Sequence, residues 1–279
     1  MALISVNALQ TLRQDGRVRI VDARYVLADS EAGRKAYVAA HIPDARYLSL
    51  QSDLSGPKSK PLLGRHPLPS PQAFSASLQR IGISPNSPVV IYDQSDSAMA
   101  AARAWFLLFL AGHAEVYVLD GGFDAWCAEG LPVQSGEQRV EVTGYPLAFA
   151  QERILTTEAL KTALASPAAA VLLDARAPER FRGEIEPIDA KAGHIPGAIN
   201  RPYTENLQGG LFKSASQLAA EFKRLDPKDA GFILSCGSGV TACHHALALS
   251  HAGMLHWRLY APSWSGWIAD DMNAVAVGN

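Results

Sequence analysis

The sequence predicts an α/β protein with two tandem domains, each a parallel sheet flanked by helices. Short apolar runs that suit buried strands alternate with longer segments of helical periodicity along the chain. The second half of the chain also repeats motifs of the first. A length of 279 residues is enough for two domains that each bury their own core.

Two short motifs define the repeat. The triplet Asp-Ala-Arg begins at Asp22 and returns at Asp174, 152 residues later. The motif His-Ile-Pro begins at His41 and returns at His194, 153 residues later. Two copies with one period indicate an internal duplication and not a solenoid.

Periodicity and helix-start signals predict the elements of the first half. Ser70 and Pro71 are an N-cap and first-turn pair typical of a helix start. The polar stretch 53–69, rich in Gly and Pro, predicts the longest irregular segment of this half. The pattern predicts helices over residues 5–13, 31–40, 70–80 and 99–112, and strands over residues 18–22, 89–93 and 116–119.

The second half is expected to follow a polar, extended connection. Thr156 or Thr157 is a suitable N-cap for its first helix. Further along, the pattern predicts strands over residues 172–174 and 232–235 and a helix over residues 240–252. We therefore expect an N-terminal domain over residues 1–133, a linker over 134–154 and a C-terminal domain over 155–279.

Composition narrows the classes of partner and compartment. A hydrophobic content of 48% and a formal net charge of -2 are typical of a globular protein and give no reason to expect nucleic acid or a membrane as a partner. The sequence has neither a secretion-signal pattern nor an apolar segment of membrane-spanning length. Cys127, Cys236 and Cys243 are too few for a disulfide framework, so we expect a cytoplasmic location.

The stretch 232–241 carries the clearest chemical signal. An apolar strand leads into Cys236, a glycine-punctuated turn follows, and a helix is predicted directly afterwards. Backbone N–H groups in such a turn favour negative charge, and therefore the thiolate form of a cysteine placed there. A buried structural cysteine is the alternative. The combination favours Cys236 as a nucleophile in an anion-binding loop made of Gly237, Ser238, Gly239, Val240 and Thr241.

Asp93 is the counterpart of Cys236 in the first half, 143 residues earlier. A carboxylate cannot perform thiolate chemistry. We therefore expect the N-terminal domain to be non-catalytic and the C-terminal domain to carry the reaction.

These motifs resemble those of the tandem rhodanese-domain sulfurtransferases over essentially the whole chain. The sequence Cys-Gly-Ser-Gly-Val-Thr at 236–241 is similar to the loop of the 3-mercaptopyruvate sulfurtransferases, whereas thiosulfate sulfurtransferases more often carry basic residues after the cysteine. The resemblance implies that Cys236 takes a sulfane sulfur from 3-mercaptopyruvate as a persulfide and passes it to cyanide, thioredoxin or a small thiol. It implies no cofactor and no metal.

The resemblance also implies arginines that bind the donor. The family's carboxylate-binding arginine falls on Arg180. A second arginine, expected after Glu186-Pro187, is replaced by Ile188, which leaves Arg182 as the nearest substitute. This departure leaves the choice between mercaptopyruvate and thiosulfate open.

A histidine that faces the cysteine in the family falls on His66. Its carboxylate partner falls on Gln51, with Asp53 close by. Because a glutamine cannot act as a carboxylate, we do not assign a Cys-His-Asp triad, and assistance of Cys236 by His66 and a carboxylate stays open.

Three other functions are weighed against this one. A thiosulfate:cyanide sulfurtransferase is the alternative activity, and a persulfide carrier or redox-sensing module with little turnover is the alternative of another class. A cysteine phosphatase is disfavoured, because position 242 is Ala where that chemistry needs an arginine. Cys243, His244 and His245 are not expected to bind a metal, since neighbouring helical side chains diverge by about 100°.

Overall fold

The computed structural model describes residues 2–96, 100–138, 140–166 and 170–279. The chain divides into two compact units that interleave along the sequence. Unit 1 comprises Met1–Gly56, Leu68–Ala150 and Gly209–Phe212, and unit 2 comprises Pro57–Pro67, Gln151–Gln208 and Lys213–Asn279. The predicted domain limits at 133 and 154 follow sequence repeats and stay a prediction.

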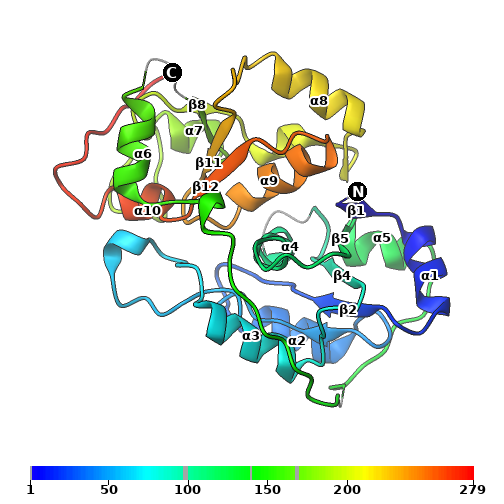
Figure 1. Cartoon of the computed structure of the whole chain (residues 1–279). Coiled ribbons are helices and arrows are strands. Elements are labelled where there is room, and N and C mark those ends of the chain that lie inside the picture. Colours follow the sequence, from blue (N-terminus) through cyan, green and yellow to red (C-terminus); the bar gives the residue numbers. More distant parts are fainter. Residues whose placement is uncertain (1, 97–99, 139, 167–169) are drawn as a thin grey trace. The chain divides into compact units, whose positions relative to one another are not determined.

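Unit 1 contains a five-stranded parallel sheet in the order β1-β5-β4-β2-β3 (Figure 1). Its strands are β1 (Leu3–Ile4), β2 (Arg19–Asp22), β3 (Arg46–Tyr47), β4 (Val89–Tyr92) and β5 (Val116–Leu119). Its helices are α1 (Val6–Gln14), α2 (Ala32–Ala39), α3 (Pro71–Arg80), α4 (Ala100–Leu110) and α5 (Gly122–Ala128).

Unit 2 repeats this arrangement, with a parallel sheet in the order β6-β12-β11-β7-β8. Its sheet strands are β6 (Ile154–Leu155), β7 (Val171–Asp174), β8 (Ile199–Asn200), β11 (Phe232–Ser235) and β12 (Trp257–Tyr260). The short β9 (Leu207–Gln208) also belongs to unit 2, whereas the short β10 (Leu211–Phe212) belongs to the Gly209–Phe212 segment of unit 1. The helices are α6 (Thr157–Leu164), α7 (Pro178–Phe181), α8 (Ala215–Lys223), α9 (Ala242–His251) and α10 (Ser263–Trp267). Single 3-10 turns are η1 (Pro61–Leu63), η2 (Gln151–Arg153) and η3 (Tyr203–Asn206).

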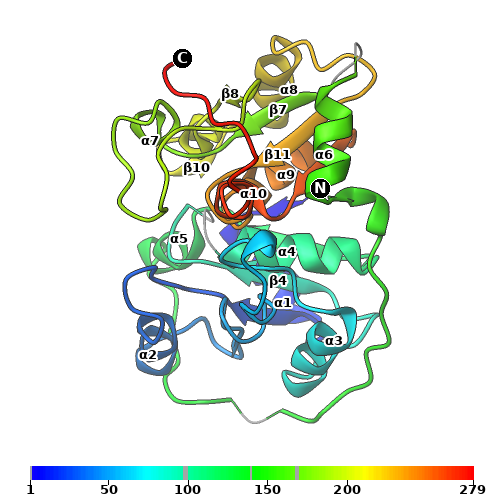
Figure 2. The same cartoon turned by 90° about the vertical axis from the view of Figure 1, so that its left-hand side faces the viewer.

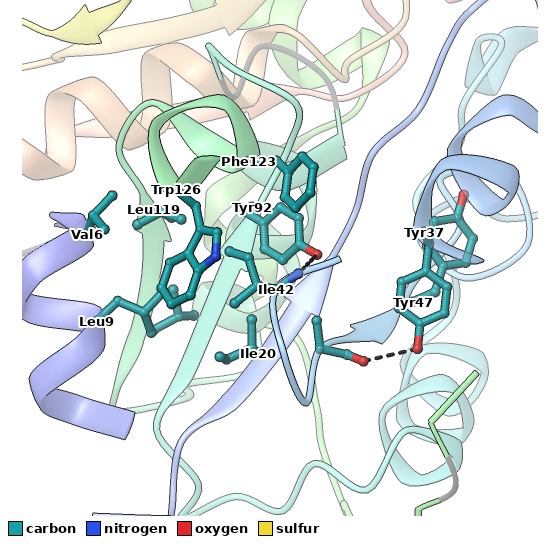
Figure 3. Close-up of a cluster of buried hydrophobic side chains, with 12 residues drawn as sticks. Val6, Leu9, Ile20, Tyr37, Ile42, Tyr47, Tyr92, Leu119, Phe123 and Trp126 are labelled. Carbon is teal, nitrogen blue, oxygen red and sulfur yellow. Dashed lines mark hydrogen bonds between the residues drawn. The ribbon is translucent and has the colours of Figure 1, made fainter. Parts of the chain in front are cut away.

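The core of unit 1 lies between the sheet and helices α1, α2 and α5 (Figure 3). Ile20, Val90 and Tyr92 point from the strands into a cluster that Trp126 of α5 completes. Because side chains alternate along a strand, Ile91 points to the opposite face, and it too is fully buried. Both faces of the sheet are therefore covered, as the alternation of strands and helices predicts.

The core of unit 2 is built in the same way. Leu172 and Ile233 of the sheet pack with Leu160 of α6 and with Trp264 and Trp267 of α10. Figure 2 shows α6 and α10 next to each other on this side of the unit. Helix α9 contacts β11 and β12 as well, so the cysteine strand is the centre of a covered sheet.

Most predicted elements are confirmed within two residues at each end. Ser70 caps α3 by accepting from the Ala73 N–H at 3.1 Å, and Thr156 caps α6 by accepting from the Ala159 N–H at 3.2 Å. The helix predicted over 240–252 spans Ala242–His251, and Thr241 precedes its first residue without a capping hydrogen bond from its side chain. Met99, the predicted start of α4, lies outside the described residues. Within the described part of the chain, no helix is long and apolar enough to cross a membrane.

Candidate active site

The cysteine loop, residues 236–241, lies between the end of β11 and the start of α9. Cys236 is only 2% exposed, and its Sγ accepts a hydrogen bond from the backbone N–H of Gly239 at 3.2 Å. Gly239 has φ +77°, and a Cβ there would lie 2.2 Å from the carbonyl oxygen of Ala261. A glycine is therefore required for the turn that brings this N–H to the sulfur.

Hydrogen bonds from the start of α10 anchor the cysteine loop. The N–H of Trp264 donates to the Cys236 carbonyl and the N–H of Ser265 donates to the Gly237 carbonyl, both at 2.9 Å. The N–H of Cys236 donates to the Ser263 hydroxyl at 3.1 Å. Ser263 is buried and has φ +52°, a conformation that side chains rarely adopt and that aims its hydroxyl at the loop.

Unit 1 carries the same backbone framework, with Asp93 in the place of the cysteine. The N–H of Phe123 donates to the Asp93 carbonyl and that of Asp124 to the Gln94 carbonyl, both at 2.9 Å. The Asp93 carboxylate accepts the N–H of Ala101, in the first turn of α4, at 3.1 Å. Asp93 therefore serves as a structural group at the position equivalent to Cys236.

The rest of the predicted loop is buried or half-buried. Ser238 is 8% exposed, and its hydroxyl lies 3.0 Å from His66 Nδ1. Val240 is buried, and its carbonyl accepts the N–H of Cys243 at 3.0 Å. The Thr241 carbonyl accepts the N–H of His244 at 3.0 Å.

Arg180 lies beside the cysteine loop in a buried network of charges. It donates to Glu186 at 2.7 Å and to Asp189 at 3.2 Å, and its side chain is 16% exposed. Its Nη2 is close to the loop backbone, 3.7 Å from the position that a Cβ on Gly237 would occupy. The backbone N–H groups of Ile188 and Asp189 also donate to Glu186, so this carboxylate organises the segment that follows it.

Arg65 is a functional candidate that sequence reasoning missed. Its guanidinium pairs with Asp189, and Nη2 would lie 3.1 Å from a Cβ on Gly237. Burial lowers the pKa of Arg65, whereas the charge of Cys236 raises it and that of Arg180 lowers it. In the sequence, the only signal for Arg65 is its position next to His66. Its partner Asp189 is 124 residues away, so no local pattern links the two residues.

Arg182, the predicted substitute for the missing arginine, is more exposed than Arg180. Its side chain is 33% exposed and pairs with Glu184 at 2.6 Å. This hydrogen bond raises the pKa of Arg182 and lowers that of Glu184. None of the contacts described for Arg182 joins it to Arg180 or Arg65.

His66 belongs with the Pro57–Pro67 segment of unit 2 and is 4% exposed. The two residues considered as its carboxylate partner have contacts within unit 1. Gln51 donates to the Tyr25 hydroxyl at 3.2 Å, and Asp53 accepts from Arg80 at 2.7 Å.

The repeated motifs have structural roles in both units. In unit 2, Arg176 donates to Asp174 at 2.7 Å and to the Gly193 carbonyl at 2.8 Å. His194 Nδ1 lies 2.8 Å from the Phe181 carbonyl, and the His194 ring stacks on Phe181. The motifs at Asp22 and His41 make the same kinds of contact in unit 1.

The geometry of His244 and His245 differs from the expectation that neighbouring helical side chains diverge. Nδ1 of each ring lies 2.9 Å from the same amide nitrogen, Asn206 Nδ2. His245 Nε2 lies 2.7 Å from the Arg201 carbonyl, so both ring nitrogens are hydrogen-bonded. The two rings therefore converge, but on an amide group. Burial holds the pKa of His245 well below its usual value.

Comparisons with known proteins agree with this arrangement. The family model described as Rhodanese-like domain matches residues 5–129 and 156–270. A Pseudomonas aeruginosa protein named probable 3-mercaptopyruvate sulfurtransferase is 42% identical over 99% of this chain and 98% of its own length. Human 3-mercaptopyruvate sulfurtransferase is 35% identical over 95% of this chain and 91% of its own length.

Other relatives and a solved structure extend the comparison. A Mycobacterium tuberculosis protein named for thiosulfate sulfurtransferase activity is 39% identical over 99% of this chain and 97% of its own. The crystal structure of the Escherichia coli 3-mercaptopyruvate sulfotransferase SseA matches 94% of this chain and 98% of that chain, with 29% identity and a TM-score of 0.82. The chain therefore belongs to the rhodanese-like family, with two rhodanese-like domains in tandem.

Proposed function

We propose that this sulfurtransferase takes sulfur from 3-mercaptopyruvate, holds it as a persulfide on Cys236 and passes it to a thiophilic acceptor. One observation carries the proposal: Cys236 Sγ is buried at the end of a central parallel strand and accepts the N–H of Gly239 at 3.2 Å. Ligands of open parallel sheets bind beyond the carboxyl ends of the strands. An N–H aimed at sulfur stabilises a thiolate and, later, a persulfide anion.

The reaction has two steps. The Cys236 thiolate attacks the sulfur of 3-mercaptopyruvate, an S–S bond forms, and the C–S bond breaks with its electron pair on the carbon. The enolate of pyruvate takes up the proton of the former thiol, which leaves pyruvate and the persulfide anion. A nucleophile such as cyanide then attacks the outer sulfur, so that thiocyanate leaves and the thiolate returns.

The donor assignment rests on the charge of the cysteine loop. Residues 237–241 carry no basic side chain. Thiosulfate is a dianion that benefits from cations beside the nucleophile, whereas 3-mercaptopyruvate needs a guanidinium for one carboxylate. Arg180, beside Gly237, supplies such a guanidinium.

Thiosulfate is the second candidate donor. Two guanidinium groups, those of Arg65 and Arg180, lie next to Gly237 and compensate in part for the uncharged loop. The relative named for thiosulfate supports this alternative. Attack on the outer sulfur of thiosulfate gives the same persulfide and releases sulfite.

The acceptor and the compartment are further parts of the proposal. Cyanide, thioredoxin or a small thiol would each accept sulfur from a persulfide by direct attack. Cys127, Cys236 and Cys243 are free thiols, which suits a reducing compartment such as the cytoplasm. We also assign the reaction to the C-terminal domain, because Asp93 replaces the nucleophile in the N-terminal domain.

Steady-state assays with 3-mercaptopyruvate and with thiosulfate, using cyanide as acceptor, test the proposal. The wild type should show the higher kcat/KM with 3-mercaptopyruvate, and Cys236→Ser should lose turnover with both donors. Intact mass after incubation with donor alone should show one added sulfur atom on Cys236. Turnover by Cys236→Ser, or sulfur on Cys127 or Cys243 instead, would contradict the proposal.

A further inference from the structure

We infer that unit 1 carries a binding site for the phosphate group of a small molecule, in a cleft lined by Arg13, Arg19 and Arg46. The inference goes beyond the proposed function, since this cleft belongs to unit 1 and the cysteine loop belongs to unit 2. Three observations carry it: the excess of positive charge in the cleft, two guanidinium groups that meet without a carboxylate, and an open hydrogen-bonding edge on one of them.

The cleft lies at the edge of the sheet where strands begin. Strand β2 starts at Arg19 and β3 starts at Arg46, while Arg13 is in the last turn of α1. Asp93, the counterpart of Cys236, follows the end of β4 and therefore lies at the opposite edge of this parallel sheet. The cleft has a volume of about 340 Å³, which is at the lower end of the range for small-molecule sites.

Arg19 and Arg46 converge on one carbonyl oxygen. Arg19 Nε and Arg46 Nη1 each donate to the Gly82 carbonyl at 3.3 Å. Among the ion pairs of the described residues, neither guanidinium has a carboxylate partner, whereas the buried Arg24 pairs with Asp22 at 2.7 Å. Like charges this close repel each other, and an anion bound between them would remove the repulsion.

The environment of Arg46 reflects this lack of a counter-charge. Burial and the nearby charge of Arg19 lower the pKa of Arg46, while the charge of Asp44 raises it. The combined effect is a lowered pKa, so the carboxylate in the cleft does not compensate for burial and repulsion. An added anion would act in the same direction as Asp44.

Arg46 also has an open edge for hydrogen bonds. The hydrogen bonds described for its side chain use Nη1, which donates to the carbonyls of Ile81 at 3.0 Å and of Gly82. Its Nε is buried and has no acceptor among the described residues. Buried N–H groups nearly always have a partner, so an unpaired one requires an explanation. Nε and Nη2 form the edge that binds two oxygens of one phosphate or carboxylate group, and a bound phosphate would supply the acceptors.

Asp44 is the carboxylate that lines the cleft, and it leaves most of the positive charge in place. It accepts from Arg13 at 3.4 Å, but its side chain is 79% exposed. Exposed ion pairs of this kind are weak. Three arginines against one aspartate make the cleft cationic in a chain whose formal net charge is -2. A compact anion suits this local concentration of charge better than a nucleic acid, which needs basic side chains spread over a face.

The internal duplication shows that the sheet does not require arginines at these places. Val21 is paired with Arg46 between β2 and β3, as Leu173 is with Ile199 between β7 and β8. Ile199 is therefore the counterpart of Arg46, and Val171, the first residue of β7, is the counterpart of Arg19. Unit 2 forms the same sheet with apolar residues at both positions. A role in folding alone therefore does not account for the two arginines of unit 1.

Calorimetric titration of the full chain with inorganic phosphate tests the inference, with chloride added to keep the ionic strength constant. Loss of a hydrogen-bonded charge should raise the Kd of phosphate roughly tenfold or more in Arg46→Gln and in Arg19→Gln. Arg224→Gln is the control, because it removes the same charge from an exposed residue that follows α8 in unit 2. It should keep the Kd of the wild type, and circular dichroism would check the fold of each variant.

Asp44→Asn gives a second test that a misfolded protein cannot mimic. It removes the carboxylate that competes with phosphate for Arg13, so the Kd should fall roughly two- to fivefold. Asp44 has φ +68°, a conformation that asparagine also adopts readily, so the turn should be kept.

Further probes distinguish the sources of the phosphate group. Glycerol 3-phosphate that binds more tightly than inorganic phosphate, with the same dependence on Arg46, would support a phosphate ester as the ligand. Tighter binding of inorganic phosphate would support the free ion. A short single-stranded oligonucleotide that binds through Arg46, when neither small anion binds, would overturn the inference in favour of a nucleic acid.

The remaining outcomes are equally decisive. No binding of millimolar phosphate or glycerol 3-phosphate to the wild type would overturn the inference. The same Kd in the wild type, Arg46→Gln and Asp44→Asn would place the anion elsewhere, for example at the cysteine loop, and would overturn it too. None of these measurements needs turnover, so they stand whether or not the proposed sulfur transfer is confirmed.

Discussion

Gly239 donates its backbone N–H to the sulfur of Cys236 at 3.2 Å, three residues back along the chain. The bond exists because Gly239 turns the backbone with a positive φ while its Cα lies close to the Ala261 carbonyl. The geometry of the nucleophile thus depends on the absence of one methyl group. Two glycines allow this dependence to be tested directly.

Gly239→Ala should damage both the fold and the activity. The new Cβ would lie 2.2 Å from a carbonyl oxygen, so the loop must move and the bond to Cys236 must break. We expect a loss of about 1–3 kcal/mol in the free energy of unfolding and a fall of roughly tenfold or more in kcat/KM. Gly253→Ala is the matched control, because Gly253 has φ +73° but nothing within 4 Å of the Cβ position. Equal effects of the two substitutions on kcat/KM would refute this explanation.

Asp174→Asn should destabilise unit 2 strongly. Asp174 and Arg176 form an ion pair whose side chains are 3% and 2% exposed, and the substitution leaves a buried guanidinium without its main counter-charge. Breaking such a pair costs about 3–5 kcal/mol. Urea unfolding followed by circular dichroism would measure the change in midpoint. Glu184→Gln removes the exposed partner of Arg182 and should leave the midpoint unchanged; a similar midpoint for both variants would argue against the buried pair.

Stability should fall as the pH drops below about 6.5. Burial holds the pKa of His245 well below its unfolded value, so the unfolded chain binds a proton that the folded chain does not. The stability that neutral His245 contributes is therefore fully present when the pH is above the pKa of this histidine in the unfolded chain. It is lost as the pH falls towards the pKa of His245 in the folded chain. His113 adds to the effect, since burial lowers its pKa as well.

Urea midpoints measured from pH 8 to pH 5 would check this dependence. His245→Gln removes the titrating ring but keeps an amide that can donate to the Arg201 carbonyl. We expect the urea midpoint of this variant to fall less steeply than that of the wild type between pH 7 and pH 5. An identical slope in the two proteins would show that His245 is not responsible.

Local patterns in the sequence were sufficient for most of the fold. The caps at Ser70 and Thr156, the strand ends at Asp22 and Asp174 and the cysteine turn all depend on residues a few positions apart. Each is visible without tertiary information, because hydrogen bonds within a turn or a helix end involve sequence neighbours. The internal repeat then extended the interpretation of one half to the other.

Contacts between distant segments escaped the same reasoning. Asn206 brings the His244 and His245 rings to one amide nitrogen from 38 and 39 residues away. Helical geometry alone indicated that the rings diverge, because it takes no account of side-chain torsions or of a shared partner. Nearness to Arg180 in the sequence favours Arg182 as the substitute cation, and it gives no indication that the Arg182 guanidinium pairs with Glu184.

The sequence by itself determined the duplication, the two parallel sheets and the cysteine turn, because these follow from periodicity and from local backbone chemistry. Only the tertiary structure decided which charges surround Cys236. Ser265 holds the backbone of Arg65, and Asp189 joins its side chain to Arg180, although these contacts link segments 200 and 124 residues apart. Electrostatic interactions depend on distance in space, and no local pattern encodes the closure of a loop of that length.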